Sequence, residues 1–575
     1  MIPATALLAI LPILLIRSGS TAGVTVARLC TVLYIAARIL PFVVRASGIA
    51  VGHHVRAKTQ NRRELLLAKV EAEEKDFAAK RAASHHKTED EDWDKLDSES
   101  AGASSAGETA DKNWRGIIGF FHPFCNAGGG GERVLWAAIR ATQKRYPRAV
   151  CVVYTGDHDV DKNTIIQKVE DRFNIHLHPP TIHFLYLTTR HHVLSSTWPH
   201  FTLLGQSLGS LVLAHDAFSL LVPDVFVDTM GYAFALALSK FYFPLVPTGA
   251  YVHYPTISTD MLGSLSAVSE AGEGQTQGLN AGAGQGLKGT LKRWYWVLFA
   301  KLYSWVGSFV DVVMTNSTWT QNHMQQLWGP RLKKVRCHGQ YPIEVVFPPV
   351  AVEELEEQIE VSEATEKERG PYLLYIAQFR PEKNHQLILH AFAELVQSWA
   401  KNSQEERPKL VLIGSVRNPE DATRVYRLRL LAHELKIKES VEFICDATWP
   451  QILDWLRRAS VGVNGMWNEH FGIGVVEYQA AGLISVVNDS GGPKLDIVVE
   501  MDDGATGFHA TTATQFAQGF KAALGLSTQE KVAMRLRARQ SAGRFTESVF
   551  ASKWLVQMGR LVELQRTLHP RRDGR

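Results

Sequence analysis

The segment EHFGIGVVE places two carboxylates, Glu469 and Glu477, with seven residues between them. The apolar run at residues 459–463 predicts a buried strand, and residues 475–481 predict a helix that ends before Gly482. Glu469 then lies on the loop beyond a strand and Glu477 in the first turns of a helix, where open α/β sheets bind ligands. Carboxylates there can hold sugar hydroxyls. Two exposed glutamates flanking an ordinary connection are the alternative interpretation.

A second strand is predicted at residues 484–487, and the turn NDSGGP follows it. Backbone N–H groups at a helix start and in a glycine turn can bind an anion beside the carboxylates. The expected donor-binding residues of this segment are Phe471, Gly472, Ser490, Gly491 and Gly492.

A run of four glycines follows another predicted strand, at residues 117–121, and precedes a helix from Glu132. Strand, glycine loop and helix form a phosphate-cradling arrangement, because glycine lets backbone N–H groups approach an anion. We expect Gly129 and Gly130 to contact the donor. A mobile surface loop and a dinucleotide site are the alternatives, the latter because Asp157 follows a second predicted strand.

Three further residues that could take part in binding or catalysis follow predicted strands. Arg380 and Lys383 lie on the loop after residues 372–377, before a helix from Gln386, where they can meet a phosphate. His253 ends the strand at residues 248–252 and points toward the same cleft. A solvated lysine and a hydrogen-bonded structural histidine are the respective alternatives.

The totals describe a globular protein of more than one domain. The chain has 575 residues, which is more than one hydrophobic core usually holds. Of these residues, 45% are hydrophobic and 21% charged, as in a globular protein. A net charge of +4 with dispersed basic residues gives no reason to expect nucleic acid as a partner. The five cysteines lack metal-ligand or redox spacing, which is typical of a reducing compartment.

The N-terminal part predicts membrane contact. Residues 2–16 are apolar and uncharged, and residues 24–49 are apolar but carry three arginines. An anchor, a cleaved signal peptide, and a spanning helix with an interfacial helix are the competing interpretations. Positive residues follow the first run and none precede it, so the positive-inside rule places the bulk of the chain in the cytosol. Residues 61–83 predict a solvated helical stalk and residues 84–111 disorder.

Two more segments are unusually apolar. Residues 203–222 and 232–246 are either core or partly inserted in a membrane surface. Residues 294–313 predict an aromatic helix with basic neighbours, suited to a headgroup boundary. A Gly-, Ser- and Ala-rich stretch, residues 263–289, separates these segments and predicts a flexible insert.

The motifs DTMGYA (228–233), YVHYPTIS (251–258) and QFRPEK (378–383), together with the paired glutamates, carry a family resemblance. The chain resembles retaining GT-B glycosyltransferases of the family-four type over residues 114–568. Among these it is most similar to the α-1,2-mannosyltransferase family of the dolichol-linked oligosaccharide pathway. Many relatives carry an arginine where Gln378 stands here, so Arg380 is a candidate for that role.

The resemblance implies an α/β GT-B fold, with two Rossmann-like doubly wound domains facing a cleft and an N-terminal membrane anchor. The expected boundaries are 1–50 for the anchor and interfacial segment, 51–113 for the charged stalk and disordered linker, 114–350 for the acceptor domain with a flexible insert at 260–290, 351–370 for a linker, 371–545 for the nucleotide-sugar domain, and 546–575 for a closing helix and tail.

The resemblance further implies transfer of the fourth and fifth mannoses from GDP-mannose, with retention, to a dolichol-diphosphate oligosaccharide on the cytosolic face of the endoplasmic reticulum. No metal or cofactor is expected. Candidate partners are the endoplasmic reticulum membrane and other early-pathway mannosyltransferases. Lys383 and Arg380 would neutralise the leaving phosphate, Glu469 would hold the mannose and Glu477 the ribose. A transferase with another lipid acceptor and a catalytically silent, membrane-tethered scaffold are the alternatives.

Overall fold

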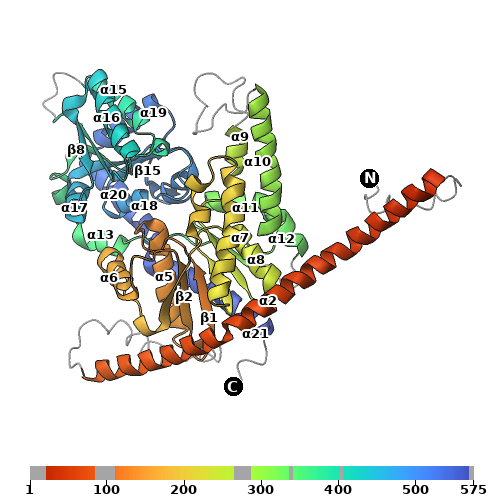
Figure 1. Cartoon of the computed structure of the whole chain (residues 1–575). Helices are drawn as coiled ribbons and strands as arrows, with labels where there is room; N and C mark the ends of the chain where they lie inside the picture. Colours follow the sequence, from red (N-terminus) through yellow and green to blue (C-terminus); the bar gives the residue numbers. More distant parts are fainter. Residues whose placement is uncertain (1–20, 84–110, 265–285, 336–340, 400–405, 569–575) are drawn as a thin grey trace.

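The computed structural model describes residues 21–83, 111–264, 286–335, 341–399 and 406–568. These residues form two α/β domains, each built on a parallel sheet, with a long N-terminal helix running along the outside of the first (Figure 1). The predicted pair of doubly wound domains is therefore confirmed.

The N-terminal domain contains a seven-stranded sheet in the order β3-β2-β1-β4-β5-β6-β7, and all of its strand pairs are parallel. The chain order reverses between the neighbours β1 and β4, which places a ligand-binding switch point beyond their carboxyl ends. The strands are β1 (Ile117–Phe121), β2 (Val150–Thr155), β3 (Ile182–Tyr186), β4 (Val225–Asp228), β5 (Thr248–Val252), β6 (Val312–Thr315) and β7 (Glu344–Val345).

The C-terminal domain contains a six-stranded parallel sheet in the order β10-β9-β8-β11-β12-β15. Its order reverses between β8 and β11, so the loops after these two strands meet at the second switch point. The strands are β8 (Gly370–Ile376), β9 (Lys409–Gly414), β10 (Val441–Cys445), β11 (Ala459–Asn464), β12 (Ile484–Asn488) and β15 (Gly507–Ala510).

Helices cover both faces of each sheet, because the central strands are buried throughout and are apolar on both faces. The helices of the first domain are α5 (Gly130–Arg145), α6 (Lys162–Phe173), α7 (Thr202–Leu220), α8 (Ala233–Tyr242), α9 (Thr259–Ser264), α10 (Gly286–Gly307), α11 (Thr318–Leu327) and α12 (Gly329–Val335). Those that follow are α13 (Val352–Gln358), α14 (Glu363–Glu366), α15 (His385–Ser398), α16 (Pro419–Glu434), α17 (Trp449–Arg458), α18 (Ile473–Ala480), α19 (Ala513–Gly525), α20 (Thr528–Ala542) and α21 (Glu547–Leu568).

The N-terminal helix α2 (Thr21–Ala83) is continuous, and its second half lies against the first domain instead of forming a solvated stalk. Gly52 allows this close approach, since a Cβ there would lie 2.0 Å from the backbone oxygen of Tyr242. Polar contacts continue along the helix. Arg63 pairs with Asp224 at 2.5 Å, and Glu73 with Lys162 at 2.8 Å. The charged composition that predicted a stalk instead supplies ion pairs to the domain surface.

The predicted anchor at residues 2–16 lies outside the described residues, as do most of the predicted disordered segment and the greater part of the insert. Among the helices of the described ranges, none is both long enough and apolar enough to cross a membrane. Residues 24–49, with their three arginines, belong to α2, whose N-terminal part projects beyond the domain (Figure 1).

Two connections tie the domains together. The predicted linker contains α13 and α14 and packs on the second domain, where Leu355 is fully buried. The closing helix α21 returns to the first domain. There Trp554 is buried against Phe120, and Arg140 of α5 pairs with Glu547 at 2.9 Å. The chain therefore crosses between the domains twice, and the two switch points face one pocket.

Candidate active site

A cavity of about 570 Å³ lies where the two domains meet, at the carboxyl ends of both sheets. The first domain contributes the glycine loop, His253 and Asn316, and the second contributes the loops after β8, β9 and β11. The structure brings these predicted residues into the lining: Gly130, His253, Lys383, Glu469, Phe471, Gly472 and Glu477. In the described residues, no group of three His, Cys, Asp or Glu side chains is placed as metal ligands would be.

Lys383 and Glu469 form an ion pair in the pocket, with Nζ 2.5 Å from Oε2. Lys383 follows β8 and Glu469 follows β11, and because these strands are neighbours their loops converge. Burial opposes ionisation of Glu469, but the charge and hydrogen bond of Lys383 outweigh it, so the pKa of Glu469 is lowered. The site thus holds a charged carboxylate and a cation in direct contact.

Glu477 lies on α18, whose first turn opens into the same pocket. Burial raises the pKa of Glu477 to about 7, and the positive charge of Arg133 opposes this shift only in part. Gly472 begins the helix with φ +111°, a conformation that favours glycine. The predicted helix is confirmed and begins two residues earlier than expected, because Gly472 sets its start.

Ser490, Gly491 and Gly492 lie outside the pocket lining and brace the loop that carries Glu469. Ser490 Oγ accepts the backbone N–H of Asn468 at 2.7 Å, and the N–H of Gly492 donates to the carbonyl of Glu469 at 2.8 Å. A Cβ on Gly491 would lie 2.3 Å from that same carbonyl oxygen. The glycines are therefore required by close backbone packing behind Glu469, where the sequence had suggested contact with the donor.

The effect of a side chain at Gly491 can be predicted from this packing. We expect Gly491→Ala to lower turnover by about tenfold or more, because its φ is +66° and the added methyl displaces the Glu469 backbone. Turnover and the thermal midpoint of this variant are compared with those of the control Gly543→Ala, where the added Cβ has no atom within 4 Å. Equal turnover of the two variants would contradict the bracing role.

The glycine loop is supported by two buried residues that the sequence analysis missed, His122 and Glu132. Glu132 Oε2 accepts the N–H of Gly129 at 2.5 Å, and its Oε1 lies 3.6 Å from His122 Nε2. Although burial opposes it, these contacts lower the pKa of Glu132. Gly129 thus precedes the first residue of α5 and is not part of the lining, whereas Gly130 and Gly131 line the pocket. A glutamate three residues after a helix-starting residue is a capping signal that could have indicated this role.

His253 follows β5 and is partly buried beside the glycine loop, where it lines the pocket. Burial lowers its pKa to about 4, so the imidazole is neutral at physiological pH. Its Nε2 has no hydrogen-bond partner among the described residues and lies 3.7 Å from an ideal Cβ built on Gly131. A neutral imidazole with one free ring nitrogen on the pocket wall can donate to, or accept from, a substrate hydroxyl.

Arg380 is not brought into this pocket. Its guanidinium lies 3.7 Å from Glu382 and is not part of the pocket lining, whereas Gln378 is. The proposed substitution of Arg380 for an arginine at position 378 is therefore not supported by its placement. Only Lys383 of this loop presents a cation to the cavity lining.

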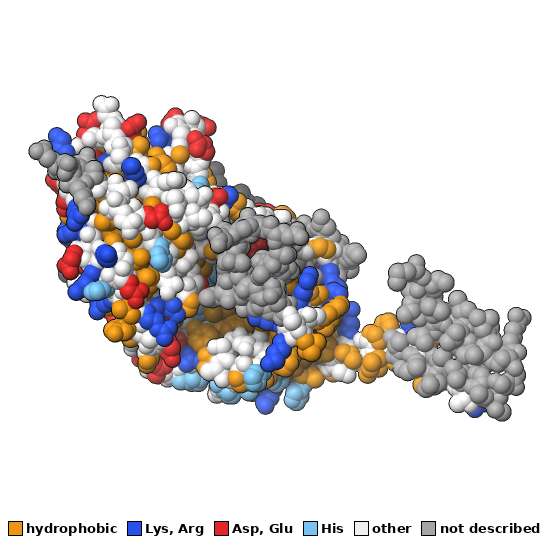
Figure 2. Space-filling view, turned by 90° about the horizontal axis from the view of Figure 1, so that it is seen from above, with side chains coloured by type: hydrophobic (Ala, Val, Ile, Leu, Met, Phe, Trp, Pro, Cys, Tyr) orange, Lys and Arg blue, Asp and Glu red, His pale blue; other side chains and the backbone are white. Residues whose placement is uncertain are grey.

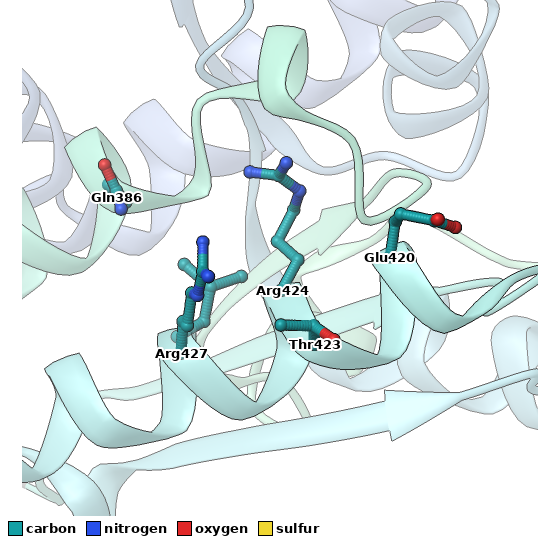
Figure 3. A pocket seen from close by; sticks show the side chains of 6 residues that line it. Gln386, Glu420, Thr423, Arg424 and Arg427 are labelled. Carbon is teal, nitrogen blue, oxygen red and sulfur yellow. The ribbon is translucent and has the colours of Figure 1, made fainter.

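A separate hollow of about 290 Å³ lies between the start of α15 and α16. Figure 3 shows Arg424 and Arg427 extending from α16 into it, with Gln386 on the opposite wall. The charge of Arg424 adds to that of Lys383 in lowering the pKa of the buried His385, although burial is the larger cause. These arginines line a different hollow from Glu469 and Glu477, so we assign them no part in binding the donor.

Other lining residues had no sequence signal of their own. Asn464 ends β11 and lies 3.4 Å from Glu469 Oε2, and Asn316 follows β6. His470 adjoins Glu469 and is neutral, since burial lowers its pKa to about 4. Their position after parallel strands is the one feature that could have identified them.

Comparison with known proteins defines the class. The model of the protein family described as "Glycosyl transferases group 1" matches residues 356–541, which include Lys383, Glu469 and Glu477. The N-terminal domain of Candida albicans trehalose-6-phosphate phosphatase matches with TM-score 0.55 and 13% identity, over 78% of this chain and 96% of that one. A Burkholderia multivorans alpha,alpha-trehalose 6-phosphate synthase matches with TM-score 0.54. At such low identity these structures show the fold alone. The chain is a glycosyltransferase of the two-domain GT-B class.

The family follows from closer relatives. The model of the family described as "ALG11 mannosyltransferase N-terminus" matches residues 115–328. A Neurospora crassa GDP-Man:Man(3)GlcNAc(2)-PP-Dol alpha-1,2-mannosyltransferase is 61% identical over 541 residues, covering 93% of this chain and 96% of the relative. The human protein of the same name is 45% identical over 451 residues, covering 77% and 87%. The chain belongs to this family of alpha-1,2-mannosyltransferases.

Proposed function

We propose that the protein transfers mannose from GDP-mannose, with retention and in α-1,2 linkage, to a dolichol-diphosphate-linked Man3GlcNAc2 oligosaccharide. Two successive transfers would add the fourth and fifth mannoses of the N-glycan precursor. Family membership supports the substrates, and the observation that carries the chemistry is the Lys383–Glu469 pair, in a pocket that the first residues of α5 and α18 also line. The cytosolic face of the endoplasmic reticulum is the proposed location.

Each of the pocket residues Lys383, Glu469 and Glu477 has a separate role in the transfer step. As the C1–O bond to the diphosphate breaks, Lys383 and the first N–H groups of α18 stabilise the negative charge that develops on the leaving oxygen. Glu469 holds hydroxyls of the mannose, and Glu477 holds the ribose. The acceptor oxygen forms the new bond to C1 on the same face, and its proton goes to the departing phosphate oxygen. No metal or cofactor is assigned to this step, since Lys383 and the helix start supply the positive charge.

A product assay tests this function. Purified protein is incubated with GDP-mannose and Man3GlcNAc2 diphosphate dolichol, and the released glycans are sized and digested with an α-1,2-specific mannosidase. We expect the product Man5GlcNAc2, which the α-1,2-specific mannosidase should digest to Man3GlcNAc2. Absence of added mannose would favour the silent-scaffold hypothesis, and a mannosidase-resistant product would overturn the linkage.

The first domain presents an apolar surface that suits a membrane-borne acceptor. Helix α10 exposes Leu287, Leu291, Trp294, Leu298 and Trp305, spaced three, four and seven residues apart along one face. The projecting part of α2 exposes a second apolar row that includes Phe42, 76% exposed. Figure 2 shows hydrophobic side chains, with lysines and arginines among them, on the side from which α2 projects. We propose that this surface contacts the lipid headgroup region.

Charges on this surface should separate membrane contact from chemistry. We expect Trp294→Glu/Leu298→Glu to lower the transfer rate to vesicle-embedded acceptor by about tenfold, because two apolar anchors are lost. Transfer to a short-chain, water-soluble acceptor should not change. The control Tyr426→Glu/Leu430→Glu alters exposed apolar residues of the other domain. Equal loss with both acceptors would count against the membrane surface.

Donor affinity should depend on pH through Glu477. Its folded-state pKa, about 7, lies above the ordinary 4.5, so the folded protein binds more protons in this window and loses stability as pH rises through it. Ribose hydroxyls donate to the ionised form, so we expect GDP to bind more tightly as pH rises from about 6 to 8. Calorimetric titration of the wild type and Glu477→Gln tests this. The wild type should gain more affinity over this range than the variant, in which the terminal phosphate of GDP still titrates, and an equal slope in both would contradict the assignment.

A further inference from the structure

The loop that carries Glu469 is held by the opposite domain on both sides of this residue. Asn468, immediately before it, donates from Nδ2 to Asp260 Oδ2 at 2.6 Å. Asp260 lies on α9 of the first domain, whereas Asn468 follows β11 of the second. The backbone of Asn468 has φ +50°, and its N–H is bonded to Ser490 Oγ.

His470, immediately after Glu469, makes the second contact. Its ring stacks on Tyr254 of the first domain, with centroids 4.0 Å apart and planes 26° apart, and lies 5.4 Å from Trp319. Because the imidazole is neutral, the contact is one of stacking and apolar burial.

Asp260 is itself fixed by its neighbours. His323 Nε2 lies 3.4 Å from its Oδ2, and the hydrogen bond from His323 lowers the pKa of Asp260. The other ring nitrogen of His323 bonds to the Thr259 hydroxyl at 2.6 Å, and its ring packs on Trp319. An oriented carboxylate in the first domain therefore meets the amide of Asn468.

We propose that Asp260 is a positioning residue for the transfer reaction, and that its bond to Asn468 fixes Glu469 against the sugar when the two domains approach. The inference rests on the proposed function of Glu469. The donor-binding groups Lys383 and Glu477 both belong to the second domain, so GDP can bind without the contact. Turnover additionally needs Glu469 to be held, and this requirement couples catalysis to the first domain, where the acceptor binds.

An exchange of the two side chains tests the proposal. Asn468→Asp sets two carboxylates against each other and keeps a residue type that tolerates positive φ. We expect it to lower kcat by about tenfold or more, since a hydrogen bond to a carboxylate is replaced by repulsion. Asp260→Asn in the same chain restores one donor and one acceptor in reversed order, and should recover most of the rate. Asn163→Asp, an exposed site on α6, is the matched control.

The other readouts separate positioning from folding and from the proposed function. GDP affinity and the thermal midpoint should stay at wild-type values in all variants. The distribution of distances between spin labels at exposed positions on α6 and α16 should be broader in Asn468→Asp than in the wild type. It should narrow again in the exchange variant, whether or not mannose is transferred. Failure of the wild type to transfer mannose would reject the proposed function. Wild-type kcat in Asn468→Asp, no recovery on exchange, or an unchanged distance distribution would overturn the positioning role.

Discussion

Replacement of Lys383 by alanine is expected to lower turnover by about 100-fold or more, with a smaller effect on GDP affinity. The ammonium group lies 2.5 Å from Glu469 in the pocket, and its interaction with the donor strengthens as charge builds on the departing diphosphate. An interaction that is stronger in the transition state than in the ground state affects kcat more than binding.

Two further variants make the expectation specific. Glu469→Ala should resemble Lys383→Ala, because it removes a contact to the sugar whose ring gains positive charge during transfer. Glu477→Ala should mainly raise the KM for the donor, because ribose hydroxyls do not change in the reaction. Arg380→Ala is the matched control on the same loop, outside the pocket lining, and should stay near wild type.

Steady-state kinetics over a range of GDP-mannose concentrations, with calorimetric GDP binding, resolve these effects. All variants should fold, because Lys383, Glu469 and Glu477 face the cavity and the side chain of Arg380 is partly exposed. Near-normal turnover of folded Lys383→Ala and Glu469→Ala would show that the donor-site assignment is wrong, and the scaffold hypothesis would then be preferred.

Replacement of Arg535 by alanine should destabilise the second domain by about 3–5 kcal/mol. The guanidinium is fully buried and makes two hydrogen bonds to Glu366, at 2.7 and 3.1 Å. It also donates to the carbonyls of Ser460 and Gly482, which join the helix α20 to the central strands. Removing it leaves a buried carboxylate and two carbonyl oxygens without their partner.

Thermal unfolding, followed with limited proteolysis, measures this loss. We expect the midpoint of the C-terminal domain to fall by about 10 °C. The double variant Arg535→Met/Glu366→Leu should recover much of the loss, because it removes both charges and fills the space. Arg407→Ala, at an exposed position, is the control and should shift the midpoint little. A small shift for Arg535→Ala would show that Glu366 finds other partners.

The sequence by itself determined the local units around the site. Buried strands, the glycine loop and the helix carrying Glu477 were predictable, because apolar runs and glycines act on the backbone over a few residues. The two α/β halves and their parallel sheets follow from the alternation of such units. Short motifs indicated the family, since they hold several chemically specific residues at fixed spacing.

Only the tertiary structure decided which of these units act together. Lys383 and Glu469 are far apart in the chain and meet because β8 and β11 are neighbours at a switch point. Gly491 and Gly492 proved to support Glu469 from behind, and Arg380 to lie outside the pocket. The charged half of α2 became a domain contact through pairs such as Arg63–Asp224. Composition cannot show such outcomes, because they depend on strand order and on which distant surfaces pack together.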